Sequence, residues 1–67
     1  MEIERVKRDI AKFYANLAKV KRRAKAVEMA ERYAKDAEYF LEKGEIESAF
    51  GAIEYAHGLL DGFLLSS

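Results

Sequence analysis

The sequence predicts an all-α fold, built as a small antiparallel three-helix bundle. Ala, Glu, Lys, Leu and Arg make up more than half of the 67 residues and proline is absent, a composition typical of long helices and coiled coils. Apolar residues recur at spacings of three and four, which is the period of a helix with one buried face. One sharp break, Lys43-Gly44-Glu45, separates two such stretches and marks a turn between helices.

The first predicted helix covers residues 3–20 and carries a regular apolar line. The line keeps the a and d positions of a heptad for four heptads, which is the pattern of a coiled coil. We call it the heptad seam, and its members are Ile3, Val6, Ile10, Phe13, Leu17, Val20, Ala24 and Val27. Because so short a chain has a small core and no disulfide to support it, the seam favours self-association, with a homodimer as the expected homo-oligomer.

The second predicted helix covers residues 25–43, and its start depends on a change of phase. After Val27 the apolar residues continue in a shifted register, as Ala30, Ala34, Ala37 and Leu41. We therefore expect a bend near residues 19–25. Since no Gly, Pro or Ser stands between residues 2 and 43, the alternative is one long helix that forms a hairpin with the shorter last helix and dimerises.

The third predicted helix covers residues 45–64 and follows Gly44, which suits the positive φ that ends many helices. It carries two adjacent apolar lines, a stripe wide enough to be buried on two sides. The lines are Ile46, Phe50, Ile53, His57, Leu60 and Leu64, and Ala49, Ala52, Ala56, Leu59 and Phe63. Gly51, Gly58 and Gly62 each cost about 1 kcal/mol relative to alanine in a helix, and we interpret them as sites of close helix packing.

The composition excludes several classes of site. Cysteine is absent and there is one histidine, so disulfides, thiolate metal sites and a zinc site from this chain alone are excluded. No cofactor is expected. The apolar runs are far shorter than the roughly 20 residues that span a bilayer, so we expect a cytoplasmic protein with no membrane partner. The many Lys and Glu beside few thermolabile residues are also typical of thermophile proteins.

The net charge of zero conceals two oppositely charged halves. Residues 1–26 carry nine Lys/Arg against three Asp/Glu, and residues 27–67 carry three against nine. The densest cluster, which we call the basic run, consists of Lys19, Lys21, Arg22, Arg23 and Lys25. Basic clusters bind phosphate backbones, so accessory nucleic-acid binding is an alternative function. The sequence pI of about 6.6 is below the roughly 9 of such domains, which favours a solvated surface or a partner for the acidic half.

Two segments of the chain resemble a known family. Residues 30–45 read AERYAKDAEYFLEKGE and residues 49–62 read AFGAIEYAHGLLDG. Tyr, Asp and Phe before a Lys-Gly turn, followed by Tyr-Ala-His-Gly and Leu-Asp, are similar to an archaeal family, the domain of unknown function numbered 357, over about residues 27–63. The resemblance implies a helical bundle and an archaeal cytosolic source, and it implies no known activity.

The polar residues of the family-like segment suggest a second hypothesis. They are Tyr33, Asp36, Tyr55, His57 and Asp61. Polar groups beside an apolar stripe need hydrogen-bond partners, and a satisfied network fixes the register of helices. We therefore predict a buried polar network that joins the last two helices.

Glu54, His57 and Asp61 are the residues to consider for a metal or small-molecule site. Glu54 and His57 form a Glu-x-x-His motif, which is a building block of di-iron bundles, and Asp61 lies one turn further along. A histidine on an apolar stripe is more often a packed, hydrogen-bonded residue, and a single such motif arises often by chance. We expect no metal, and this site ranks third among the functions considered.

These observations favour a structural or protein-interaction module that self-associates. No nucleophile with a paired base and no glycine-rich phosphate loop stands in the sequence, so an enzyme is not expected.

Overall fold

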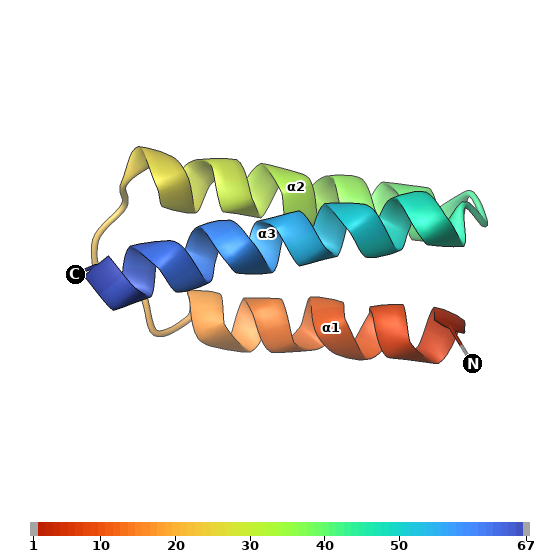
Figure 1. The fold of residues 1–67 in the computed structure, drawn as a ribbon, viewed down its shortest axis with the longest axis horizontal. Helices are drawn as coiled ribbons and strands as arrows, with labels where there is room; N and C mark the ends of the chain where they lie inside the picture. The colour runs from red at the N-terminus through yellow and green to blue at the C-terminus, as the bar shows by residue number, and fades with distance from the viewer. Residues whose placement is uncertain (1, 67) are drawn as a thin grey trace.

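Three α-helices form the bundle in the computed structural model, which describes residues 2–66. They are α1 (Glu2–Leu17), α2 (Lys25–Glu42) and α3 (Ile46–Ser66). All three follow the long axis of a body of 34 × 18 × 15 Å, and helices consecutive in sequence run in opposite directions (Figure 1). α1 and α3 therefore run parallel. The predicted all-α antiparallel three-helix bundle is confirmed, and the alternative of one long helix paired with a shorter one is wrong.

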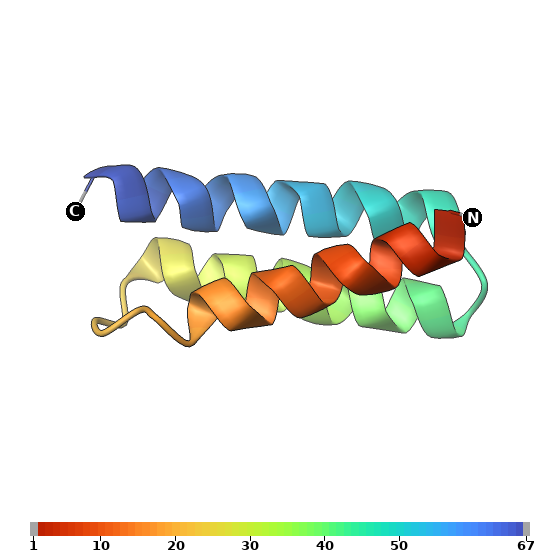
Figure 2. The ribbon, with the colours of Figure 1, turned by 90° about the horizontal axis from the view of Figure 1, so that it is seen from below.

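The core is made of apolar side chains from all three helices. α2 and α3 share the most extensive interface, where small buried residues let the two helices approach closely. These are Ala30, Ala34 and Ala37 on α2, and Ala49 and Ala56 on α3. α1 lies across the other two helices (Figure 2) and adds the larger buried side chains Val6, Ile10 and Phe13. α3 is therefore packed against both neighbours, as its wide apolar stripe predicted.

The heptad seam is used within the chain. Val6, Phe13 and Val27 are fully buried, and Leu17, Val20 and Ala24 pack against the same core. These side chains are covered by α2 and α3 of their own chain. The interpretation of the seam as a contact with a second copy is therefore wrong, and self-association needs another surface.

α1 ends at Leu17, three residues before the end of the predicted helix. The Lys19 N–H donates to the Asn16 carbonyl oxygen and the Val20 N–H to that of Leu17, each across 3.0 Å. Such three-residue spacings close tighter turns than the α-helix and are frequent where a helix ends. Residues 18–24 then form the connection to α2, so most of the basic run lies at the bend rather than in a helix.

Gly44 has a φ of 80° and ends α2. The Gly44 N–H donates to the Leu41 carbonyl oxygen across 3.1 Å, and the Glu45 N–H to that of Phe40 across 2.9 Å. This pair of bonds is the Schellman motif, in which the residue after the cap takes a left-handed conformation. The short turn leads directly into α3, which begins at Ile46 and extends two residues past the predicted end, to Ser66.

The other three glycines do not serve close helix packing. Gly51, Gly58 and Gly62 are exposed on α3, and a Cβ atom added at any of them would meet nothing within 4 Å. The close-packing interpretation is therefore wrong: the three glycines lie on the face of α3 that points away from the core. Among residues 2–66, none of the helices is long and apolar enough to cross a membrane.

Candidate functional site

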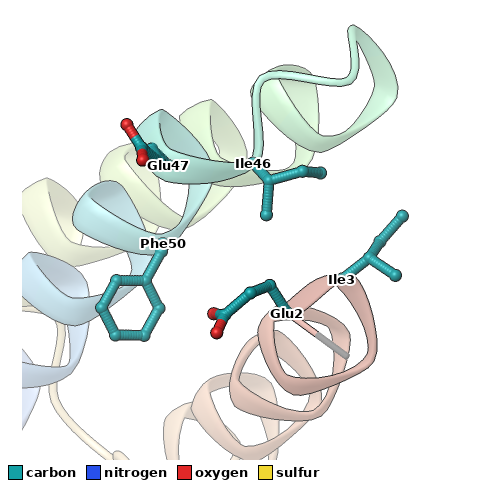
Figure 3. Close-up of a pocket in the computed structure, with 5 residues that line it drawn as sticks. All are labelled: Glu2, Ile3, Ile46, Glu47 and Phe50. Atoms are coloured by element: carbon teal, nitrogen blue, oxygen red, sulfur yellow. The ribbon is translucent and has the colours of Figure 1, made fainter.

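An apolar groove lies where α1 and α3 begin. Because these helices are parallel, their first turns meet at one end of the bundle, and the groove between them has a volume of about 740 Å³. We call it the N-terminal groove, lined by Glu2, Ile3, Ile46, Glu47 and Phe50. In Figure 3 the side chains of Ile3 and Ile46 lie on one side of the opening and Phe50 on the other, the Glu2 carboxylate points toward Phe50, and Glu47 points away from α1. The groove is thus lined mainly by apolar side chains, with the Glu2 carboxylate facing its Phe50 wall and Glu47 at its edge.

Arg5 holds one wall of the N-terminal groove in place. Its guanidinium carbon lies 5.4 Å from the centroid of the Phe50 ring, within the range of a cation–π contact. Phe50 itself is only partly buried. The contact joins α1 to α3 beside the groove.

The two ends of the bundle differ in charge. The end with the N-terminal groove also holds the α2–α3 turn, and its carboxylates outnumber Arg5 and Lys43. They are Glu2, Glu4, Glu42, Glu45 and Glu47. The opposite end carries the basic run and the end of α3, as Figure 1 shows. One end of the molecule is therefore rich in carboxylates, and the other carries the basic run.

The basic end also presents an apolar side chain to solvent. Leu65, in the last turn of α3, is 89% exposed and is the most exposed of the large apolar residues described in 2–66. Nearby, the Arg22 guanidinium lies 5.3 Å from the centroid of the Phe63 ring, which brings the basic run against α3. Exposed apolar and cationic groups thus occur together at this end.

The basic run is partly engaged within the chain. Arg22 contacts Phe63, and Arg23 donates to the Glu31 carboxylate across 2.8 Å. Lys19, Lys21 and Lys25 are exposed. A cation that already contacts its own chain neutralises a phosphate less readily, so fewer counterions are released from a nucleic acid on binding. This geometry therefore favours a solvated surface over a nucleic-acid interface.

His57 links α3 to α1. Its Nε2–H donates to the Asp9 carbonyl oxygen across 2.8 Å, and its ring meets Phe13 edge to face, with centroids 5.8 Å apart. The side chain is partly buried. His57 is therefore a packed, hydrogen-bonded residue on the apolar stripe.

The predicted buried network is wrong in both burial and connections. No polar or charged residue described in 2–66 is buried; Asp36, Tyr55 and Asp61 are exposed. His57 bonds toward α1, away from the other four residues. The sequence pattern indicated polar residues beside an apolar stripe, but these lie at the rim of the helix interfaces, where water can satisfy them.

Tyr33 and Tyr55 nevertheless meet at the surface between α2 and α3. Their ring centroids are 4.6 Å apart with an interplanar angle of 68°. They belong to a second groove of about 490 Å³, which we call the tyrosine groove. It is lined by Tyr33, Asp36, Phe40, Ser48, Gly51, Ala52 and Tyr55. Three of the five predicted network residues thus share one open surface site.

Glu54, His57 and Asp61 do not form a metal centre. Within residues 2–66, no group of three or more His, Asp or Glu side chains is placed to hold a metal ion. Glu54 and Asp61 are exposed, whereas His57 is turned toward α1. The three side chains are therefore not brought together as ligands.

Sequence reasoning missed the N-terminal groove. The apolar lines place Ile3 and Phe50 in separate helices, so their spacing gives no sign of a shared groove. The signal that could have found the groove is the antiparallel order itself, since three consecutive helices place the first and third N-termini at one end.

Comparisons with curated proteins and with solved structures find no match. A family model does match, over residues 3–64, and its description is a protein of unknown function, DUF357. The match covers nearly all of the three helices and every lining residue of the two grooves except Glu2. The chain therefore belongs to the DUF357 family, whose function is unknown.

Proposed function

We propose that this protein is a small helical interaction module, without catalytic activity, that self-associates as a homodimer. One observation carries the proposal: the two ends of the bundle are complementary. One end has an apolar groove among carboxylates, and the other has the exposed Leu65 beside the basic run.

An antiparallel pairing of two copies uses this complementarity twice. With the long axes opposed, the basic end of each copy lies beside the acidic end of the other, and each Leu65 lies near the partner's N-terminal groove. Two equivalent contacts related by a two-fold axis close the assembly as a dimer, whereas a single end-to-end contact repeats into an open chain. Burial of Leu65 supplies the apolar gain, and the opposite charges favour this orientation.

Light scattering after gel filtration, at low and high salt, tests the proposal. We expect a dimer at low salt that weakens as salt screens the charged ends. Leu65→Asp is expected to give a folded monomer, because it places a carboxylate at the acidic groove. Tyr39→Asp is the matched control, since Tyr39 is also exposed but lines neither groove, and it is expected to remain dimeric.

A wild-type protein that is monomeric at all concentrations contradicts self-association. Binding to DNA or RNA by such a monomer, with an affinity that falls as salt rises and is lost when Lys19 and Lys21 are replaced by Glu, would instead support the alternative function through the basic run.

A further inference from the structure

We propose that the tyrosine groove binds a cationic side chain, lysine or arginine, of a protein partner. The groove lies along the α2–α3 interface and reaches toward the acidic end, but it shares no lining residue with the N-terminal groove, so its test is separate from that of self-association. Three features of the groove favour such a ligand: the arrangement of the aromatic rings, an unpaired carboxylate, and the open space at Gly51.

The tyrosine groove is formed by one ridge from each of two antiparallel helices. Tyr33, Asp36 and Phe40 follow one another at three and four residues on α2, which places them on one face. Ser48, Gly51 and Tyr55 do the same on α3. The aromatic rings therefore stand at the sides of the groove, and the contact between Tyr33 and Tyr55, 4.6 Å between centroids, closes one end.

The charge of the groove suits a cation. Asp36 is the one charged residue that lines it, and α3 contributes no lysine or arginine anywhere along its length. Within the described residues 2–66, the Asp36 carboxylate makes no ion pair or hydrogen bond. An anionic ligand would be repelled by this carboxylate, whereas a cation is attracted by it and by the faces of the aromatic rings.

The exposure of the tyrosine rings also favours a cationic ligand. Tyr33 is partly buried and packs against the core, whereas Tyr55 is 53% exposed, so Tyr55 presents most of the aromatic surface that a partner can meet. A guanidinium stacks on such rings and also pairs with a carboxylate, and an ammonium uses the same two attractions as a point charge. Guanidinium and ammonium groups are both common on protein surfaces, so the expected partner is a protein.

Gly51 keeps the tyrosine groove open. A Cβ atom at this position would meet nothing within 4 Å, so the fold does not require glycine there, yet glycine costs about 1 kcal/mol in a helix. The same cost at Gly58 and Gly62 shows that glycine by itself is no sign of a site. At Gly51 the missing side chain lies in a lined groove, and a larger residue would fill the space that a ligand needs.

A titration followed by NMR tests the inference. The probe is the capped peptide acetyl-Ala-Arg-Ala-amide, and its control is the same peptide with citrulline, which is uncharged and nearly the same shape as arginine. We expect saturable shifts of the Tyr33 and Tyr55 ring signals with the arginine peptide, and binding at least about fivefold weaker with the citrulline peptide. Equal binding of both peptides, or no shift with either, overturns the inference.

Substitutions locate the binding in the groove. Gly51→Leu is expected to abolish the shifts while the protein keeps its helical circular dichroism, because the added side chain fills the groove. Gly62→Leu is the matched control, because Gly62 is equally exposed and open on α3 but lies two turns beyond Tyr55, and it is expected to bind as wild type does. Asp36→Asn is expected to weaken binding about fivefold or more. Undiminished binding to folded Gly51→Leu overturns the assignment, whatever the outcome of the self-association experiment.

Discussion

His57 on α3 donates from Nε2 to the carbonyl oxygen of Asp9 on α1, 48 residues away in the chain, across 2.8 Å. Because a carbonyl oxygen can only accept, the Nε2 atom carries the proton in this contact. The imidazole ring also packs edge to face on the buried Phe13. Both contacts fasten α1, the helix with the smaller interfaces, to the α2–α3 pair.

His57→Ala is expected to lower the free energy of unfolding by about 1–3 kcal/mol, since it removes the hydrogen bond and the ring contact together. His57→Phe keeps an aromatic ring and is expected to lose less. Urea unfolding followed by circular dichroism measures both. If the alanine variant unfolds at the same urea concentration as wild type, the link between α1 and α3 contributes nothing.

The glycines are expected to respond to alanine with opposite signs. Gly44 has a positive φ, so Gly44→Ala is expected to destabilise the fold by about 1–2 kcal/mol. Gly58 has helical neighbours and open space around it, so Gly58→Ala is expected to stabilise by up to about 1 kcal/mol. Thermal unfolding of the two alanine variants measures both effects. Shifts of the melting temperature in the same direction would contradict the left-handed conformation of Gly44.

Phe13→Ala is expected to unfold the protein. Removing a buried phenylalanine costs about 3–5 kcal/mol, which equals the stability that a core of this size supplies. Circular dichroism is expected to show the loss of helix at every protein concentration. A variant that keeps its helical signal and unfolds at the wild-type temperature would contradict the central place of Phe13 in the core. Tyr39→Ala, at an exposed position, serves as the control and is expected to change stability by less than about 0.5 kcal/mol.

Stability is expected to fall at alkaline pH through Tyr14. Burial raises the pKa of the Tyr14 phenol above its ordinary value of 10.0, and the nearby carboxylates of Glu38 and Glu31 raise it further. The folded protein therefore holds this proton more tightly than the unfolded chain. Its contribution to stability is complete below the unfolded pKa and is lost as the pH rises through the folded pKa.

Urea unfolding of wild type and Tyr14→Phe across that pH range measures the effect. The variant is expected to lose less stability than wild type as the solution becomes alkaline. Parallel pH profiles for the two proteins would exclude a role of Tyr14.

Much of the fold was predictable from the sequence. The three-and-four spacing located the helices, and Lys43-Gly44-Glu45 located the turn between α2 and α3. The end of α1 was not predictable in this way. Val20 and Ala24 continue the spacing of the heptad seam, and both pack on the core, yet they do so from a connection that folds back over the bundle. The spacing of apolar residues therefore does not distinguish a helix that continues from a connection whose side chains reach the same core.

The site was less predictable than the fold. The period of the sequence shows which residues share a face of a helix, but it does not show whether another helix covers that face. Gly51 was for this reason interpreted as a packing residue. The partner of His57 is a backbone carbonyl, which has no side-chain signature in the sequence. Both grooves combine residues from two helices, so their walls become visible only when the helices are placed together.

The short turn at Gly44 has a consequence for the order of folding. It joins the two helices with the largest shared interface through residues 43–45, so their contacts are close in sequence and little loop entropy opposes them. The α2–α3 hairpin can thus assemble quickly as a unit, and α1 docks on it through the longer connection of residues 18–24. Amide protons of α1 are then expected to exchange with solvent when α1 alone detaches from the bundle. Those at the centres of α2 and α3 are expected to exchange only when the whole protein unfolds.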